Sequence, residues 1–473
     1  MKMAAGTRRG AEAAGDGLVA ALGRGDLTAL IINTVIGSGI FGLPLLVTGL
    51  LGAVSPLGYV AAAAGIGLIA LCFAEVGAQF RRAGGPYLYA REAFGGLVGA
   101  EVGWITWLMR ISAAAATARI FTAYLAVFWP AADQALERTL LLTALFALLG
   151  WVNIRGVQAG ARTSNVLTVA KLAPLAVFVA VGIWFVRGAT FMAWRPTARG
   201  GWLEAILLLI FAFGGFDNAM FPASEMRDPR RDVPAGLLMG MGVVVVFYLA
   251  IQVVFQGVVP PGTVSAQPLA VAAGEFLGRA GAPLMAIGAM ISIWGWFAAT
   301  TLGTPRLTFA MAQHGDLPRQ LAAVHPRFRT PHVSILLYVL ASWALALAGN
   351  FEWNASLSAI ARLATYGATC AALPVFRRRT PLHEATGTRP EQSGRALPPS
   401  EFRPQPDQRE GVLRRAAVPL PVFRVPGGWA APALGLGFCA LLLSQMGRSD
   451  FLLLGATLVL GLGSWVAQRR RAD

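Results

Sequence analysis

The stretch Leu-Ile-Ile-Asn-Thr-Val-Ile-Gly-Ser-Gly-Ile-Phe-Gly-Leu-Pro, residues 30–44, decides the fold predicted for this chain. It lies inside an apolar run over 27–50, which exceeds the roughly 20 residues that a helix needs to cross a bilayer. Gly37, Ser38 and Gly39 fall at its middle, where each glycine weakens a helix by about 1 kcal/mol relative to Ala. We therefore predict a membrane-spanning helix that is interrupted near its centre.

A second interruption of this kind occurs in the apolar run over 202–225, which reads Phe-Ala-Phe-Gly-Gly-Phe-Asp-Asn at 211–218. Unwound backbone is tolerated at membrane depth only where it lines a cavity or is buried in protein. Free N–H groups at the start of a half-helix attract a carboxylate, and free carbonyls at the end of one suit an ammonium. Paired breaks therefore fit an α-amino acid, which carries both groups, although close helix packing at the glycines is the alternative.

Ten further apolar runs bring the predicted number of membrane spans to twelve. They cover 55–80, 96–128, 137–154, 163–186, 235–259, 282–312, 331–349, 356–375, 428–447 and 450–468. The interrupted runs are then spans 1 and 6, as expected for an inverted repeat of five plus five helices followed by two more. A short amphipathic surface helix is expected at 266–278, outside this count.

The composition argues against an ordinary soluble enzyme and against a nucleic-acid binder. Only 13% of the 473 residues are charged and 56% are apolar, whereas soluble domains carry about a quarter of charged residues. The net charge is +16, but with the N-terminus inside, 28 of the 39 Lys and Arg fall in predicted cytoplasmic segments and six in outer loops. This asymmetry is the positive-inside pattern of a membrane protein, so the charge needs no nucleic acid to explain it.

We divide the chain into five segments. A cytoplasmic N-terminal tail, a ten-helix core, a polar cytoplasmic loop, two last helices and a cytoplasmic C-terminus are predicted at 1–26, 27–375, 376–427, 428–468 and 469–473. The tail has no short apolar core of a signal peptide. The loop is rich in Pro, Arg and Gln, and either a simple linker or a partner-binding segment would have this composition.

The sequence predicts no cofactor and no metal ion. Cys72, Cys370 and Cys439 lie in apolar runs without the paired spacing of a disulfide framework or a thiolate metal site. The four histidines lie in or beside polar loops, which removes the usual ligands for haem or copper within the membrane.

Several motifs make the chain resemble the amino acid permeases of the amino acid, polyamine and organocation (APC) superfamily. They lie at 37–41, 73–76, 82–87, 90–95, 211–234 and 305–318. The resemblance covers most of 27–375 and implies a LeuT-type fold that works by alternating access. From this resemblance we expect a permease rather than an enzyme, located in the inner (plasma) membrane of a bacterium.

The resemblance also implies a substrate site on the two breaks. Gly37, Ser38 and Gly39 would bind the substrate carboxylate, and carbonyls near Thr34 and Val35 would receive its amino group. In span 6 the implied site residues are Phe211 as the aromatic gate, the carbonyls of Ala212 and Phe213, and beyond them Gly215 and Phe216. Room beside the glycines and the aromatic walls favour a neutral, fairly large amino acid, with a cationic one as the second option.

Charged residues inside predicted spans are functional candidates because each costs about 2.5–3.5 kcal/mol at a helix centre. Lys171 is the strongest of these candidates, because only two of the chain's basic residues are lysines. A desolvated lysine can lose its proton, which arginine cannot. The resemblance places it where sodium-coupled relatives hold sodium. It implies proton coupling or a fixed cation that braces span 1, and snorkelling toward the cytoplasm is the alternative.

Other polar residues carry open alternatives. Asp217 follows the second break and either senses protons or substrate, or caps the next half-helix. Arg110 in span 3 is expected to pair with Asp217 or Glu101, and a substrate role for Arg110 or Arg119 is the weaker alternative. Trp294 and Trp296 either line the pocket or only pack.

An inner gate of ion pairs is a further expectation. The candidate acids near cytoplasmic helix ends, with arginines close by in the sequence, are Glu75, Glu225 and Asp316, beside Arg81, Arg230 and Arg306. Solvated surface charges are the equal alternative.

The sequence as a whole predicts a secondary active amino acid transporter, with protons as the expected coupling ion and the lipid bilayer as its surroundings. An exchanger that swaps amino acids or amines without an ion is the first alternative, and a membrane receptor or scaffold acting through the polar loop is the second. Its oligomeric state cannot be read from the sequence.

Overall fold

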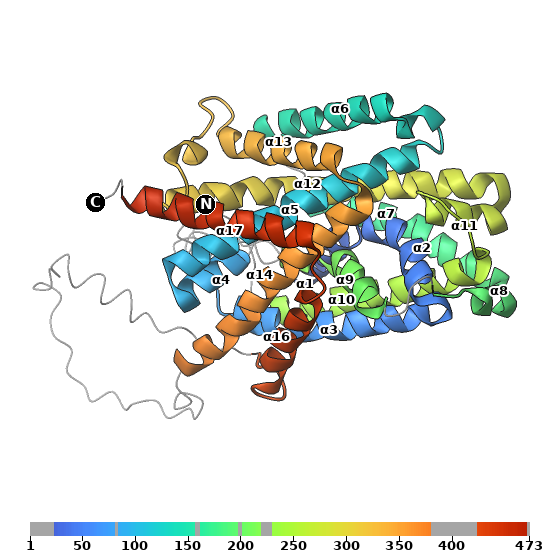
Figure 1. Cartoon of the computed structure of the whole chain (residues 1–473), viewed down its shortest axis with the longest axis horizontal. Helices are drawn as coiled ribbons and strands as arrows, with labels where there is room; N and C mark the ends of the chain where they lie inside the picture. The colour runs from blue at the N-terminus through green and yellow to red at the C-terminus, as the bar shows by residue number, and fades with distance from the viewer. Residues whose placement is uncertain are drawn as a thin grey trace, which may run out of the picture.

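The structure, a computed structural model, describes residues 23–80, 84–156, 161–196, 201–218, 229–379 and 423–470. All regular elements in these ranges are helices, and most of the long ones run side by side in one bundle (Figure 1). The N-terminal tail and the polar loop predicted at 376–427 fall largely outside the described residues.

Two predicted spans are broken. The first consists of α1 (Arg24–Val35) and α2 (Gly39–Leu51), so the helix stops at the Gly-Ser-Gly motif. The sixth begins with α9 (Trp202–Phe213), after which the chain turns at Gly214 and Gly215 and continues in a short 3₁₀ turn to Asn218. Gly215 has φ +116°, a conformation that side-chain-bearing residues rarely adopt.

Most of the remaining helices follow the apolar runs of the sequence, but α4 and α8 lie between those runs. The remaining helices are α3 (Ser55–Gly77), α4 (Gly85–Phe94), α5 (Gly96–Leu125), α6 (Ala135–Ile154), α7 (Ala161–Gly182), α8 (Gly188–Ala193), α10 (Pro229–Val258), α11 (Pro268–Leu277), α12 (Gly281–Gln313), α13 (His332–Ala348), α14 (Phe351–Arg379), α16 (Ala430–Leu443) and α17 (Arg448–Arg469). Seven stretches of the described residues are long and apolar enough to cross a membrane, and α13 and α16 are shorter apolar helices.

The surface of the bundle suits lipid rather than water. Helix α17, for example, exposes Phe451, Leu452, Val459 and Leu460, although its other side packs against α5, where the Trp104 indole donates a hydrogen bond of 3.1 Å to Ser464 Oγ. Exposed apolar side chains over a whole helix face are costly in water and favourable in hydrocarbon. The chain is a multi-pass membrane protein.

The short helix α11, expected outside the membrane count, packs against α12 and α2. Its first turn is fixed by Tyr124 of α5, whose hydroxyl oxygen accepts a hydrogen bond of 3.3 Å from the Leu269 N–H. The hydroxyl in turn donates to the Phe41 carbonyl of α2 at 2.8 Å. A single tyrosine therefore connects α11 to the second half of the broken first span.

Ion pairs join helix ends that the sequence predicts to face the cytoplasm, but their partners differ from the sequence neighbours. Glu75 at the end of α3 is fully buried and bonds Arg377 of α14 through both oxygens, at 2.7 and 2.5 Å. Asp316 bonds Arg91 of α4 at 2.5 Å instead of Arg306, which is exposed. Arg81 and Glu225 lie outside the described residues.

Loss of the Arg377 side chain should destabilise the fold more than loss of any nearby surface arginine. Arg377→Ala leaves the Glu75 carboxylate buried without its cation, which costs about 3–5 kcal/mol. Arg378 is an exposed neighbour, so the matched variant Arg378→Ala should lower the free energy of unfolding by less than about 1 kcal/mol. The free energy of unfolding in detergent measures both, and adding Glu75→Gln to Arg377→Ala should recover part of the loss. Equal values for the two single variants would contradict this account of the pair.

Candidate functional site

The two breaks lie against each other at the centre of the bundle. A Cβ placed on Gly39 would lie 2.7 Å from the Cα of Ala212, and one on Gly215 would collide with the carbonyl oxygen of Thr34. Such approaches of backbone to backbone are open only to glycine. The glycines on which the predicted interruptions rested thus also hold the first and sixth spans in direct contact.

Tyr248 of α10 connects the ends of both first half-helices. Its hydroxyl lies 3.1 Å from the carbonyl oxygen of Val35 and 3.2 Å from that of Ala212. Both carbonyls belong to the last turn of a helix, where no intrahelical donor is available. On the other side of the break, Ser38 Oγ lies 2.8 Å from Thr117 Oγ1 of α5.

Lys171 of α7 supplies the donors for the unwound backbone of the first span. Its Nζ donates to the carbonyl oxygens of Asn33 at 2.9 Å, Ile36 at 2.7 Å and Ser292 at 3.3 Å. An ammonium has three protons, so these three acceptors match it in number. The side chain is fully buried, which is incompatible with snorkelling to the cytoplasm and agrees with a cation that braces the first span.

Helix α12 completes the support of the first break. Ser292 Oγ bonds the Ile36 carbonyl at 3.0 Å, and the ring of Trp296 lies so close to Gly37 that an added Cβ would be 2.9 Å from Cδ1. Trp296 also lines the cavity described below, whereas Trp294 packs edge-on against Phe121 at 6.1 Å between ring centroids.

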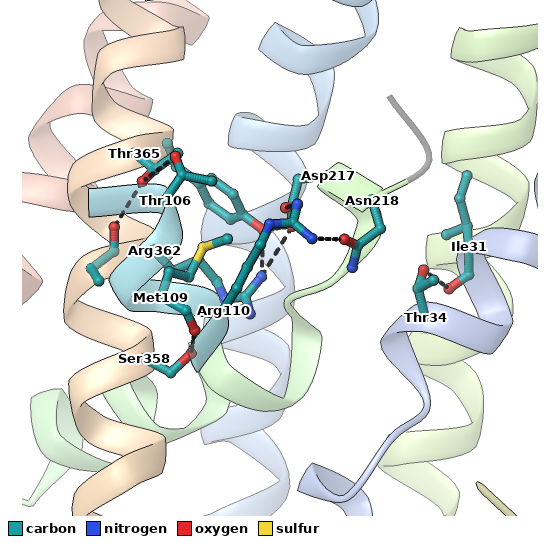
Figure 2. A network of polar contacts seen from close by, with 12 residues as sticks. Ile31, Thr34, Thr106, Met109, Arg110, Asp217, Asn218, Ser358, Arg362 and Thr365 are labelled. Atoms are coloured by element: carbon teal, nitrogen blue, oxygen red, sulfur yellow. Dashed lines mark hydrogen bonds and ion pairs between the residues drawn. The ribbon is translucent and has the colours of Figure 1, made fainter. Parts of the chain in front are cut away.

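A buried cluster of charges lies beside the second break (Figure 2). Asp217 accepts from Arg110 of α5 through Oδ2 at 2.8 Å, and from Arg362 of α14 through Oδ1 at 3.0 Å. Tyr366, one turn after Arg362, bonds the same Oδ1 at 2.8 Å. Arg110 also contacts the amide oxygen of Asn218. Asp217 is fully buried and each arginine is only 4% exposed, so we call Arg110, Asp217 and Arg362 the buried charge cluster.

A small cavity lies beside this cluster, at the second break. It is lined by Met109, Arg110, Ala113, Gly215, Asp217, Asn218, Trp296, Thr300 and Arg362. Its volume of about 10 Å³ leaves room for about one water molecule. This cavity is therefore too small for an amino acid, which would require a wider one.

The predicted site residues meet in space, but three aromatic side chains do not face the cavity. Phe211 packs on Phe351 at 5.9 Å between ring centroids. Phe213 packs on Tyr248 at 5.1 Å and Phe216 on Tyr366 at 5.0 Å. These rings fill the helix packing around the breaks rather than the walls of the described cavity.

Several residues of the site were not singled out from the sequence, among them Arg362 and Tyr366 at the buried charge cluster and Tyr248 and Ser292 at the first break. Arg362 fell inside a predicted span, and the cost of a charge at that depth was a signal that marks it as a candidate. Tyr366 carries no such signal, because a tyrosine in an apolar helix is ordinary packing material. Of the two partners considered for Arg110, the structure selects Asp217. Arg119 lies on the same helix but is not among the residues that line the cavity.

The helices and the buried site define a membrane protein with a polar centre built on two interrupted helices. Residues 22–397 match the family described as amino acid permease, and the chain belongs to this family. Its relatives are transporters, as their names state.

Three relatives illustrate the range of this family. The chain is 28% identical to the methylthioribose transporter of Bacillus subtilis (strain 168) over 376 residues, 75% of this chain and 81% of the relative. It is 25% identical to the branched-chain amino acid permease BcaP of the same organism over 459 residues, 93% and 91% of the two chains. It is 30% identical to the Asc-type amino acid transporter 1 of Mus musculus over 378 residues, 74% and 69%.

A methyl group on Gly39 should disturb the site, whereas the same change elsewhere in α2 should not. Gly39→Ala forces the two breaks apart, at a cost of about 1–3 kcal/mol for an overpacked contact, and should weaken amino acid binding. A Cβ on Gly49 would meet nothing within 4 Å, so Gly49→Ala is the matched control. The measurement is the thermal shift that the best-bound amino acid of a screen produces. If Gly39→Ala binds the amino acid as tightly as the wild type does, the contact between Gly39 and Ala212 is not part of the substrate site.

Proposed function

We propose that the chain is a secondary active transporter that moves an amino acid across a bacterial plasma membrane by alternating access. Membership of the amino acid permease family supports amino acid transport, and the twelve apolar runs support twelve spans with both termini in the cytoplasm. The observation that carries the proposal is the direct contact between the two breaks, beside a buried cavity that Gly215, Asp217 and Asn218 of the second break line. No covalent chemistry is required of these residues.

A LeuT-type inverted repeat of five plus five helices is supported by the position of the breaks. They fall in the first and sixth spans, at the same depth, and they touch each other through Gly39 and Gly215. In such a repeat the substrate site lies at the interface of the two halves. The last two helices, α16 and α17, pack on the outside of this core.

In the proposed site, the backbone at Gly37, Ser38 and Gly39 binds the substrate carboxylate at the positive end of α2. The carbonyls near Thr34, Val35, Ala212 and Phe213 receive the amino group. The carbonyl oxygens of Val35 and Ala212 already lie near the Tyr248 hydroxyl, and that of Val35 also accepts from the Gly37 N–H at 2.8 Å. A carbonyl oxygen has two lone pairs, so that of Ala212 can accept a second bond. Gly215 and Phe216 complete the backbone side of the pocket, and Phe211 closes over it as the gate.

Lys171 is the proposed coupling residue. When protonated, it holds the unwound end of α1 through the carbonyls of Asn33 and Ile36 and connects it to α12 through Ser292. When the proton leaves, the amine keeps fewer donors than the three carbonyls require, and the brace on the first span weakens. A proton at this position would thus change how readily the first span moves. Asp217 is the second candidate for a coupling group.

An exchanger without a coupling ion is the alternative. It is favoured by the complete set of acceptors around Lys171, because a permanently charged ammonium would be well satisfied there. In that case Lys171 is a fixed brace. A receptor or scaffold would instead depend on the loop at 376–427, whose deletion should leave uptake intact if the transporter proposal is right.

Variants of Lys171 separate a titrating group from a fixed brace. Lys171→Arg keeps a cation that cannot lose its proton, and Lys171→Gln keeps hydrogen-bond donors without charge. Under proton coupling, both should lose uptake driven by a pH gradient by about 10²-fold or more, while exchange against internal substrate continues at a reduced rate. Uptake into empty and amino-acid-loaded vesicles, with and without the gradient, measures both activities.

Two results would contradict proton coupling through Lys171. Gradient-driven uptake by Lys171→Arg at the wild-type rate would remove proton release at this residue from the mechanism. A wild-type protein that ignores the gradient and requires internal substrate would establish the exchanger instead.

A further inference from the structure

A groove on the surface of the bundle lies where α17 passes the end of α12. It has a volume of about 370 Å³, within the range of about 300–1,000 Å³ that is typical of ligand sites. One wall comes from α17, which contributes Leu460 and Gly463, and the other comes from Leu317 and Leu321, which follow α12. Trp104 of α5 lines the groove as well. Most of the lining is therefore apolar.

The groove is a gap in the packing between α17 and the end of α12. Helix α17 packs on α5 and α14, and it reaches the end of α12 through Ser464, whose Oγ lies 3.4 Å from the Asp316 carbonyl oxygen. Membrane helices often use glycine for close contact with a neighbour. Gly463 does the opposite, because a Cβ placed there would meet nothing within 4 Å. This glycine keeps the groove open.

The groove opens on the part of the surface that faces hydrocarbon. On α17, Val459 and Leu460 line the groove and are 71% and 61% exposed. Water in such a groove would find few polar partners, whereas a hydrocarbon chain fills it without losing a hydrogen bond. The apolar part of the groove thus suits an acyl chain of a lipid.

Two exposed arginines lie at the end of the groove that the sequence predicts to face the cytoplasm. Arg319 lies between Leu317 and Leu321 in the sequence, at the edge of the lining. Arg470 keeps helical backbone angles (φ −62°, ψ −16°) and follows Gly463 by seven residues, so it lies two turns along the same side of α17. Neither arginine bonds an acceptor among the described residues.

The order of these groups along α17 matches the order of the parts of a lipid. From Gly463 to Arg470 the helix rises by about 10 Å, so the arginine lies at the level of the headgroups when the groove lies among acyl chains. Tryptophans are enriched at this boundary. Trp104 lines the groove, and Trp465 lies under the guanidinium of Arg469, whose Cζ is 4.5 Å from the ring centroid.

We propose that the groove binds an anionic phospholipid, with one acyl chain between α17 and the segment 317–321 and the phosphate at Arg319 and Arg470. Basic groups beside a gap between membrane helices are typical of sites for anionic headgroups. A guanidinium also presents several donors to a phosphate. A zwitterionic phospholipid would offer the same chain but would bring its own cation next to the arginines. The proposal concerns a surface apart from the buried cavity and does not depend on the transported substrate.

Two acidic side chains lie close to the groove without lining it. Asp316 precedes Leu317, but its carboxylate is paired with Arg91 at 2.5 Å. Glu101 packs against Gly461, on the side of α17 that faces α5. The attraction that the two exposed arginines offer to an anion is therefore not cancelled from within the groove.

A second copy of the chain is the competing occupant. Two copies in one membrane share their orientation, so a two-fold contact through this face would bring the same ends of both α17 helices together. Arg319 and Arg470 of one copy would then lie near those of the other. Such a juxtaposition of like charges is unfavourable, so the charges favour the lipid.

The test measures thermal unfolding of the purified full-length protein in a neutral detergent as lipid is added. Dioleoyl phosphatidylglycerol and dioleoyl phosphatidylcholine carry the same acyl chains, so the difference between them reports the headgroup. We expect the anionic lipid to raise Tm by at least about 2 °C more than the zwitterionic one, because a ligand of the folded state stabilises it. Soluble glycerol 3-phosphate, which lacks acyl chains, should leave Tm unchanged.

Variants assign the effect to the arginines and to the groove. Arg319→Gln combined with Arg470→Gln should remove most of the difference between the two lipids. Arg469→Gln is the matched control, because that arginine lies on Trp465, and it should keep the difference. Gly463→Leu fills the groove and should remove most of the shift that either lipid produces. Its control is Gly455→Leu on the same helix, where a Cβ also meets nothing within 4 Å.

Several outcomes would overturn the proposal. Equal shifts by the two lipids in the wild type exclude recognition of the headgroup, and an equal effect of glycerol 3-phosphate excludes the acyl chain. A loss in Arg469→Gln as large as in the double variant would leave only a general attraction to basic surface. A dimer in size-exclusion chromatography that Gly463→Leu converts to a monomer would assign the groove to a second copy. If the double variant is unstable, Gly463→Leu and Gly455→Leu still test the groove.

Discussion

The unwound backbone between α1 and α2 is the constraint on which the rest of the site depends. At membrane depth every free carbonyl must find a donor within the protein, because hydrocarbon offers none. Lys171, Ser292 and Tyr248 meet this demand from three different helices. The surrounding helices are therefore arranged around the break. Any group that adds or removes a hydrogen-bond donor there changes how firmly the first span is held.

The buried cations of the core also differ in the acceptors that surround them. Lys171 faces only backbone oxygens, so its charge is offset by dipoles, whereas Arg110 and Arg362 face a carboxylate. A backbone carbonyl accepts from an ammonium or an amine, but a carboxylate pairs with a guanidinium as an ion. The two cationic centres thus have different partners, backbone dipoles for Lys171 and a carboxylate for the two arginines.

Much of this arrangement could be predicted from the sequence, and the rest could not for definite reasons. Glycine runs in apolar segments marked the breaks, and the rarity of lysine marked Lys171. The orientation of Phe213 and Phe216 depends on helix rotation within the bundle, which apolar segments do not encode because every face is apolar. Asp316 pairs with Arg91 instead of Arg306, since the partner comes from α4, more than two hundred residues away in sequence.

The hydroxyl of Tyr248 has a consequence for how the two broken helices communicate. It holds one proton and lies within bonding distance of two carbonyls, one at the end of α1 and one near the end of α9. The proton can serve only one of them at a time, so whichever helix end gains the bond leaves the other without it. The two ends thus compete for this one donor, and a small rotation of the hydroxyl moves its hydrogen bond from one helix end to the other, without a rotamer change or the breaking of a helix.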